Sequence, residues 1–331
     1  MKNKKGLIIL IAIIALALIS LCFGIVGGNN APDEPGVVIT NPGIVRIEKK
    51  FGLGKENAHP KLKNDYIAVL HIEGVISPSN KTYDQEWLLR TIGNLKDDKK
   101  NCGILLFIDS PGGTVYEADE AYLKLLEYKK ETERPVYAYF ASLAASGGYY
   151  IGCAADTIFA NRNTLTGSIG VICGSSVDAT GMLEKIGIKS TTFTAGRNKN
   201  MLNYNSPLTE EQRNIMQSIA DDAYEQFTGI VAESRGKDIA YVKTLADGRI
   251  YTAAQAKENG LVDDICSLED AKEKISKEQD FDGSFEDFKF EYEETFFQSL
   301  MNTISFISHP KAFIDDVRGS TTPLRLSYMA Y

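Results

Sequence analysis

Histidine is scarce in this chain of 331 residues, which holds only His59, His71 and His309. They stand in a linker-like stretch, a strand-like run and the tail, away from the serine motif described below. A Ser-His-Asp triad is therefore hard to build from them. Together with five cysteines they show no metal-ligand spacing, so we expect no metal and no cofactor.

The cysteines are dispersed, and no spacing indicates a disulfide framework. Cys22 falls in the apolar N-terminal stretch, and the other four stand beside apolar or small residues. We expect these four to be buried free thiols: Cys102, Cys153, Cys173 and Cys266.

Positive charge is in deficit, because 36 lysines and arginines face 44 aspartates and glutamates, for a net charge of -8. That balance gives no sign of a nucleic-acid surface. The chain also lacks an internal repeat, so a second catalytic copy within it is not expected. With 44% hydrophobic and 24% charged residues, the composition is that of a globular protein.

Charged residues are absent from Gly6 to Asn30, a stretch that is apolar over about the 20 residues that a bilayer-spanning helix needs. Three lysines precede it, and Asp33 and Glu34 follow it. The positive-inside rule predicts a single-pass anchor in the cell membrane, with a cytoplasmic N-terminus and the remaining chain outside. A cleaved signal peptide and a lipoprotein site at Cys22 are the alternatives.

Composition and pattern divide the chain into four regions. Residues 1–28 are predicted to be a cytoplasmic stub and transmembrane anchor, and residues 29–63 an extracytoplasmic linker. Residues 64–280 alternate strand-like and helical patterns, which predicts an α/β domain with a parallel sheet and crossover helices. Residues 281–331 are a C-terminal extension. The predicted strands are Tyr66–Ile72, Ile104–Ile108, Val136–Tyr139, Thr157–Ala160 and Lys189–Thr194, and the predicted helices are Asp84–Leu95, Tyr116–Lys129 and Thr209–Ser234.

The segment Ala141–Tyr150, ASLAASGGYY, is the strongest candidate for chemistry. Ser146 precedes two glycines, at the point where the apolar run Val136–Phe140 should end and a helix begin. A serine hydroxyl becomes a nucleophile when a base takes its proton and backbone N–H groups stabilise the oxyanion. The alternative is a glycine-rich turn in which Ser146 only caps the helix.

Lysine is the remaining candidate base, which favours a Ser-Lys pair. A lysine accepts a proton only as the neutral amine, so burial must lower the pKa from its reference value of about 10.4. Lys199, in TTFTAGRNKNMLNYNSP, follows a strand-like run and is the best candidate. Lys185 and Lys189 are the other candidates, and most lysines are simply solvated.

The segment Gly103–Gly113, GILLFIDSPGG, is typical of a buried strand that ends in a turn. Sites in open α/β sheets gather at the carboxyl ends of strands, where this turn and Ser146 would both fall. The N–H groups of Gly113 and Gly147 could then form an oxyanion hole. The alternative is an ordinary strand-to-helix loop in which the aspartate and serine of DSPGG act as caps.

Five motifs in order carry a family resemblance. They are DSPGG at 109–113, SLAASGGYY at 142–150, TLTGSIGV at 164–171, AGRNK ending at Lys199, and DGRIYTAAQAKENGLVD at 247–263. Over roughly residues 64–280 the chain resembles the signal peptide peptidase A family, serine proteases of the ClpP/crotonase-like superfamily, in the short single-repeat form.

The resemblance implies a role for five residues. Ser146 would be the nucleophile, Lys199 the general base, and Ser168 the hydroxyl that holds the lysine amine; Gly113 and Gly147 would supply the oxyanion N–H groups. The lysine segment departs from the family, which commonly has an aromatic residue before the lysine and an acidic residue after it. This chain has Asn198 and Asn200 there.

The same resemblance implies a membrane-anchored serine endopeptidase that hydrolyses remnant signal peptides and other apolar, unfolded peptides at the outer face of the cytoplasmic membrane. It also implies a homo-oligomer, in the form of a ring. The sequence leaves open whether Ser146 and Lys199 pair within one chain or between two. Three rival functions stay open: a noncatalytic membrane scaffold of the same fold, a crotonase-like acyl-CoA enzyme, and a lipoprotein-like binding protein.

The C-terminal extension holds two further features. TFFQSLMNTISFI at 295–307 has near-helical apolar spacing, which predicts an amphipathic helix that packs on a partner subunit or rests on the bilayer. The last residues, PLRLSYMAY, could bind as an extended peptide. We hypothesise that the C-terminus enters an active site as a pseudo-substrate or is trimmed there.

Overall fold

The computed structural model describes residues 62–292 and 327–329. The chain divides into two compact units, Met1–Ala58 and His59–Tyr331, and every described residue belongs to the second. The predicted anchor, nearly all of the predicted linker and the predicted helix at 295–307 lie outside the described residues. Within the described ranges, no helix is long and apolar enough to cross a membrane.

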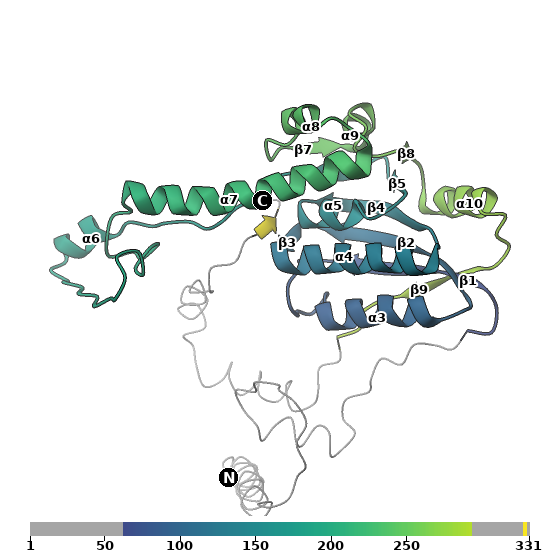
Figure 1. Cartoon of the computed structure of the whole chain (residues 1–331), viewed down its shortest axis with the longest axis horizontal. Helices are drawn as coiled ribbons and strands as arrows, with labels where there is room; N and C mark the ends of the chain where they lie inside the picture. Colours follow the sequence, from purple (N-terminus) through teal and green to yellow (C-terminus); the bar gives the residue numbers. More distant parts are fainter. Residues whose placement is uncertain (1–61, 293–326, 330–331) are drawn as a thin grey trace, which may run out of the picture. The chain divides into compact units, whose positions relative to one another are not determined.

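Strands and helices alternate along the described chain, as the sequence pattern predicts (Figure 1). The first half holds β1 (Tyr66–Glu73), α3 (Gln85–Asp97), β2 (Asn101–Ser110), β3 (Gly112–Thr114), α4 (Val115–Thr132), β4 (Val136–Ala145), α5 (Gly147–Gly152), β5 (Thr157–Ala160) and β6 (Leu165–Gly167). The second half holds α6 (Thr180–Lys185), α7 (Glu210–Arg235), α8 (Ile239–Leu245), β7 (Ile250–Thr252), α9 (Ala253–Glu258), β8 (Asp264–Ile265), α10 (Leu268–Glu278), β9 (Ser284–Phe288) and β10 (Ser327–Met329).

The main sheet has the strand order β7-β6-β4-β2-β1-β9, and β5 and β8 extend it beside β4. Every pair in it is parallel except β6 with β7. The register of β2 against β4 runs from Ile104 beside Val136 to Ser110 beside Ala144. The two strands therefore end at the same edge, where both the glycine turn and the serine motif begin. The predicted α/β class with a parallel sheet is confirmed.

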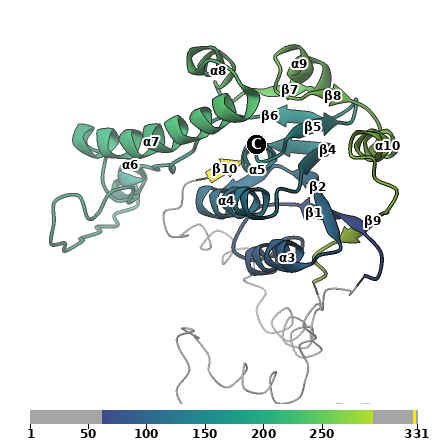
Figure 2. The ribbon, with the colours of Figure 1, turned by 45° about the vertical axis from the view of Figure 1, so that its right-hand side comes forward.

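Alternation along β1 shows how the sheet divides the core. Tyr66 and Leu70 join the larger apolar cluster, to which α3, α4 and α5 contribute, whereas Ile67 and Val69 point to the opposite face. On that second face Ile275 of α10 packs against the sheet, and Figure 2 shows α10 apart from α3 and α4. Burial on both faces explains why the central strands are almost continuously apolar.

Helix α7 has well-defined ends. Thr209 and Gln212 form a capping box at its start, each side chain bonding the other residue's backbone N–H. Its C-cap, Gly236, has φ 57°, a left-handed conformation that glycine adopts without strain. The 26 residues between these caps span about 39 Å at 1.5 Å per residue.

One predicted strand, Lys189–Thr194, is wrong. These residues belong to the segment 171–209 between β6 and α7, which we call the arm; its regular element is α6. Phe193 is 93% exposed, and α6 buries no side chain. A strand needs a neighbour for its N–H and C=O groups, and within the described part of the chain no strand pairs with residues 189–194. Figures 1 and 2 both show α6 beside the first half of α7.

The four described cysteines are free. Cys153 and Cys173 are buried, as predicted, whereas Cys102 and Cys266 are half-buried. Cys22 lies outside the described residues.

Candidate active site

Ser146 occupies a strained turn between the end of β4 and the start of α5, with φ 56° and ψ -119°. A positive φ in a residue other than glycine is costly and is found mainly at functional sites. The backbone N–H of Ser146 donates to the Gly167 carbonyl at 2.8 Å, and its own carbonyl accepts from the Tyr150 N–H at 2.9 Å. The turn is therefore held from both sides, in the strand-turn-helix form that presents the nucleophilic serine of α/β-hydrolases.

The hydroxyl of Ser146 is buried without a hydrogen bond. The residue is 1% exposed, and its Oγ has no partner among the described residues. It does not cap α5. An unsatisfied buried hydroxyl costs about 1–3 kcal/mol, which argues against a purely structural serine. Directly after it, the N–H of Gly147 begins a helix and has no acceptor one turn earlier.

The glycine turn after β2 places Gly113 in β3, which packs beside α5. Ile76 donates to the Gly112 carbonyl at 2.9 Å, and Thr114 donates to the Ile76 carbonyl at 3.0 Å. Because backbone groups alternate along a strand, the N–H of Gly113 points to the other side of β3. A Cβ at Gly113 would lie 1.8 Å from the Ile76 carbonyl oxygen, so only glycine fits there.

That other side of β3 is occupied by β10. The two strands are antiparallel, with Tyr328 opposite Gly113 and Met329 opposite Gly112. β10 also contacts α5, and the views in Figures 1 and 2 agree in setting it beside β3. An extended stretch of backbone therefore lies along the glycine turn and touches the helix that follows Ser146.

Ser168 lies at the same edge of the sheet. β6 ends with Gly167 opposite Ala145, and Ser168 follows at φ 49°, 7% exposed, with its N–H bonded to the Arg249 carbonyl at 2.8 Å. The role of Gly167, whose carbonyl holds the Ser146 N–H, is absent from the sequence interpretation. The motif TGSIGV carried the signal, since it sets a glycine directly before Ser168.

Asp109 and Ser110 do not cap a helix; their side chains form hydrogen bonds that connect the ends of neighbouring strands. The Ser110 hydroxyl donates to the Gly74 carbonyl at 2.6 Å and accepts from the Gly112 N–H at 3.0 Å. The Asp109 carboxylate accepts from the Leu143 N–H at 3.0 Å. These bonds hold β2, the glycine turn and the last residues of β4 in one arrangement.

Lys199 is not brought to the serine of its own chain. It is exposed on the arm, and its backbone N–H donates to the Gly196 carbonyl at 3.0 Å. Both residues before it contact Glu211 in the first turn of α7: Arg197 by an ion pair at 2.6 Å and Asn198 by a hydrogen bond at 3.1 Å. The other candidate lysines, Lys185 and Lys189, are also exposed on the arm.

The length of α7 explains the separation. Its residue Gln226 bonds the Tyr150 hydroxyl of α5 at 2.7 Å, near Ser146, while Glu211 bonds the segment of Lys199. Residues 211 to 226 span about 22 Å of helix axis. The structure therefore gathers Ser146, Gly147, Gly113 and Ser168 at one edge of the sheet and leaves Lys199 at the far end of α7.

His71 belongs to a different part of the sheet. Its Nδ1 and Nε2 lie 2.9 Å from Glu73 and Asp287, on β1 and β9, and β2 separates β1 from β4. A triad with Ser146 is not formed. Over residues 62–292 and 327–329, no group of three metal-ligating side chains is placed to hold an ion.

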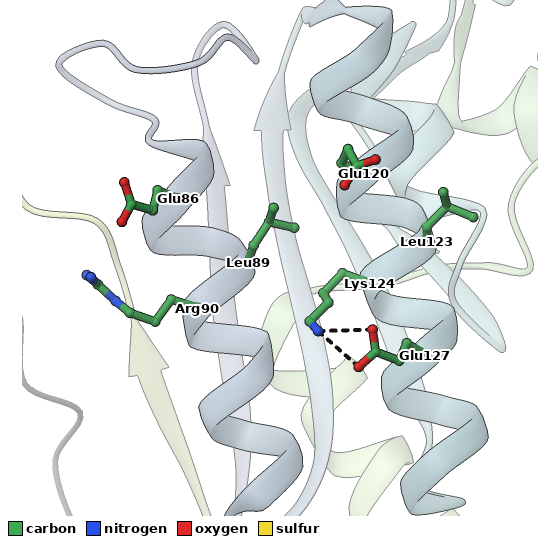
Figure 3. Close-up of a pocket in the computed structure, with 7 residues that line it drawn as sticks. All are labelled: Glu86, Leu89, Arg90, Glu120, Leu123, Lys124 and Glu127. Carbon is green, nitrogen blue, oxygen red and sulfur yellow. Dashed lines mark hydrogen bonds and ion pairs between the residues drawn. The ribbon is translucent and has the colours of Figure 1, made fainter. Parts of the chain in front are cut away.

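A groove of about 500 Å³ lies between α3 and α4, away from these residues (Figure 3). Its walls are mostly charged, and Lys124 is already paired with Glu127. The lining residues are Glu86, Leu89, Arg90, Glu120, Leu123, Lys124 and Glu127. None is a predicted site residue, and the groove adds nothing to the site.

Comparison with known proteins agrees with these motifs. Residues 128–282 match Peptidase family S49. A protein of Enterococcus faecium provisionally named signal peptide peptidase SppA is 35% identical over 285 residues, which cover 84% of this chain and 82% of that protein. Protease 4 of Haemophilus influenzae is 30% identical over 72% of this chain and 39% of its own length.

A solved structure of a ClpP1 mutant from Listeria monocytogenes aligns with 61% of this chain and 92% of its own, at 21% identity and a TM-score of 0.40. That likeness is too distant to bear on the fold, and the ClpP/crotonase assignment stays a prediction. The identity and coverage of the Enterococcus relative, together with the matched residues, show that the chain belongs to Peptidase family S49.

Proposed function

We propose that this protein is a membrane-anchored serine endopeptidase in which Ser146 is the nucleophile and Lys199 of a second copy is the general base. One observation carries the proposal. The Ser146 hydroxyl is buried and has no partner within the described chain, and the Ser146 backbone is strained, while Lys199 is exposed near the start of α7. Each chain thus offers half of a dyad.

In the proposed reaction, the neutral amine of Lys199 takes the Ser146 proton as the hydroxyl oxygen attacks a peptide carbonyl. The N–H groups of Gly113 and Gly147 stabilise the oxyanion of the tetrahedral intermediate. Lys199 then protonates the leaving amine as the peptide bond breaks. A water molecule, deprotonated by the same lysine, hydrolyses the acyl-enzyme and frees Ser146. The Ser168 hydroxyl orients the amine.

Solvation favours supply of the lysine from another chain. A lysine works as a base only after losing most of its water. The arm leaves its lysines exposed in a single chain, together with a set of apolar side chains that a second copy would cover. That set is Val177, Met182, Ile186, Ile188 and Phe193, each at least 51% exposed. Packing of the arm on a neighbouring subunit would bury these apolar side chains and desolvate Lys199 at the same time. If the same contact is repeated around a ring, every subunit receives a lysine.

Pairing of β10 with β3 supports a peptide as the substrate class. The β3 edge accepts an extended backbone beside Gly113, and main-chain pairing of this kind binds peptides with little demand on sequence. An unfolded segment leaves both sides of its backbone free for such pairing, so the proposed substrates are unfolded segments. Remnant signal peptides fit this class. Their apolar character would suit an enzyme held at the outer face of the cell membrane by the apolar stretch Gly6–Asn30.

The rival functions differ in what Ser146 does. A crotonase-like acyl-CoA enzyme would keep thioester turnover after Ser146→Ala. A noncatalytic scaffold would assemble but hydrolyse nothing. A lipoprotein-like binding protein would be lipidated or released at Cys22, which intact mass would reveal. A strained, unpartnered serine beside a glycine N–H favours the peptidase over all three.

Hydrolysis of an unstructured apolar peptide by the full chain in detergent tests the proposal. We expect the wild type to be active and both Ser146→Ala and Lys199→Ala to lose at least about a thousandfold in kcat, as other dyad and triad enzymes do. Co-expression of the two inactive variants is then decisive for the second copy. It should restore a fraction of the activity, because mixed assemblies contain sites with Ser146 from one chain and Lys199 from the other. Full activity of Ser146→Ala, or inactivity of the mixture, would contradict the proposal.

A further inference from the structure

A hydrogen-bonded cluster ties the helix after the nucleophile to α7. The Tyr150 hydroxyl donates to the Asp119 carboxylate of α4 at 2.6 Å. The Gln226 side-chain amide of α7 donates both to that hydroxyl at 2.7 Å and to Asp119 at 3.1 Å. We call these three residues the α7 junction. None of them has a part in the reaction steps above.

Aromatic packing makes the junction rigid. Tyr150 and Phe227 are both fully buried, and their rings lie 5.1 Å apart. On the other side, Tyr122 of α4 meets Tyr150 edge-on at 5.5 Å. Tyr150 stands four residues after Ser146, one turn along the same short element. A shift of α7 would therefore act directly on the turn that holds the nucleophile.

The other end of α7 carries the lysine. Glu211 receives contacts from Arg197 and Asn198, the two residues directly before Lys199. A capping box at Thr209, two residues before Glu211, begins the helix and fixes the conformation of its first turn. An α-helix is stiff over the roughly 22 Å between Glu211 and Gln226. The orientation of α7 at the junction therefore sets where Lys199 lies.

We propose that α7 is a positioning lever: the junction orients it on the nucleophile helix of its own chain, so that Lys199 reaches the Ser146 of the next chain. Asp119, Tyr150, Gln226 and Glu211 are then positioning residues that act on a site in another subunit. This inference rests on the proposed Ser146–Lys199 dyad between two copies. In this role the four residues set the direction of α7, which is a different task from holding the Ser146 turn of their own chain.

Gln226→Ala is the informative change, because it removes the α7 side of the junction and leaves the Tyr150–Asp119 bond in place. A misplaced base lowers the rate of the chemical step without weakening substrate binding. We expect a kcat about three- to tenfold lower with KM unchanged. Glu225→Ala is the matched control, since the neighbouring Glu225 is paired with Lys243 of α8 and takes no part in the junction.

Mixed assemblies of the full chain distinguish two roles of Gln226: positioning Lys199 through α7, or supporting the Ser146 turn of its own chain. Chains with Lys199→Ala supply Ser146, and chains with Ser146→Ala supply Lys199. Gln226→Ala is added to one kind of chain at a time, and peptide hydrolysis is measured, with thermal unfolding and native mass as checks on folding and assembly. The lever predicts the three- to tenfold loss when the change is in the lysine-supplying chain. Glu211→Ala in that chain, at the far end of the lever, should also lower kcat.

Three results would overturn the inference. A loss seen only when Gln226→Ala is in the serine-supplying chain would show that the junction merely supports Ser146. Equal activity with Gln226→Ala or Glu211→Ala in either chain would show that α7 is not positioned by these contacts. An inactive mixture before either change is added would overturn the dyad between copies itself, and the lever with it.

Discussion

Burial has opposite effects on the reactivity of the two nucleophilic side chains that flank α5, Ser146 and Cys153. The Ser146 hydroxyl is neutral and loses only hydrogen bonds when it is buried, so it stays available to a base brought by another chain. The thiol of Cys153, at the other end of the same helix, would have to ionise to react. Burial raises the pKa of that thiol to about 12. Two nucleophilic atoms on one short helix thus differ in chemistry because one needs a charge and the other does not.

The Cys153 thiol should resist alkylation while the protein is folded. Its pKa in the fold lies above the value of about 8.5 expected for an unfolded chain, so it stays protonated near pH 8.5. The neutral thiol therefore favours the folded state below pH of about 8.5, and this contribution is lost as the pH rises toward about 12. Iodoacetamide followed by mass spectrometry should label Cys153 only after unfolding in urea. Half-buried Cys102 is the internal reference; equal labelling of both in the native state would contradict the prediction.

The element that matters most to the site is the short strand β3. β3 has three residues, yet it is bonded to Ile76 on one side and to β10 on the other. It holds its place because two glycines let backbone approach backbone, and Ser110 fixes the turn before it. Any side chain at its centre would separate β3 from Ile76 and move the Gly113 N–H group, which the proposed reaction assigns to the oxyanion.

Gly113→Ala should therefore damage both stability and activity. The added Cβ meets the Ile76 carbonyl oxygen at 1.8 Å, and the backbone has to shift. We expect the free energy of unfolding to fall by about 1–3 kcal/mol, with peptide hydrolysis lost. Gly93→Ala in α3 is the control, since its Cβ has nothing within 4 Å and a helical alanine is worth up to about 1 kcal/mol. Urea unfolding of both variants measures the difference, and an unchanged midpoint for Gly113→Ala would refute the argument.

At the scale of the whole molecule, the arm is the feature that a single chain leaves unexplained. It has exposed apolar side chains, an unpaired run at residues 189–194 and the proposed base, whereas the central strands of the sheet are buried. Segments of this kind are stable when another surface covers them. In the proposed assembly that surface belongs to the next copy, so folding of the arm, burial of the base and formation of the site are one event.

Phe193→Asp tests that view without disturbing the core. The ring is 93% exposed, so the thermal stability of the single chain should hardly change. Assembly should fail, because a charge would be buried in the contact, and hydrolysis should fall at least about tenfold. Leu123→Asp is the matched control: it is 48% exposed on α4, outside the arm. Native mass and peptide hydrolysis report the outcome; intact assembly of Phe193→Asp would refute the role of the arm.

Local sequence was enough for most of the sheet and its helices. Alternating and continuous apolar runs predicted the central strands, and the helical pattern that begins at Thr209 predicted the start of α7 within one residue. Ser146 and Gly113 were singled out because each comes after a strand-like apolar run, whereas Ser168 came only from the family resemblance. The parallel register brings the ends of these strands to one edge of the sheet. Lys189–Thr194 was mispredicted since its composition is strand-like but no neighbour is present.

By itself the sequence determined the parallel α/β domain and the place of Ser146 between a strand and a helix, with glycines directly after it, because these depend on side-chain periodicity and on residues close together in the chain. Tertiary structure alone decided the rest. It showed that Gly167 holds the turn at Ser146, that β10 lies along β3, and that the contacts of α7 with the Lys199 segment and with α5 are about two nanometres apart along the helix. Those facts depend on contacts between residues far apart in sequence, and no local pattern encodes which distant partner a strand, a carbonyl or a helix end will meet.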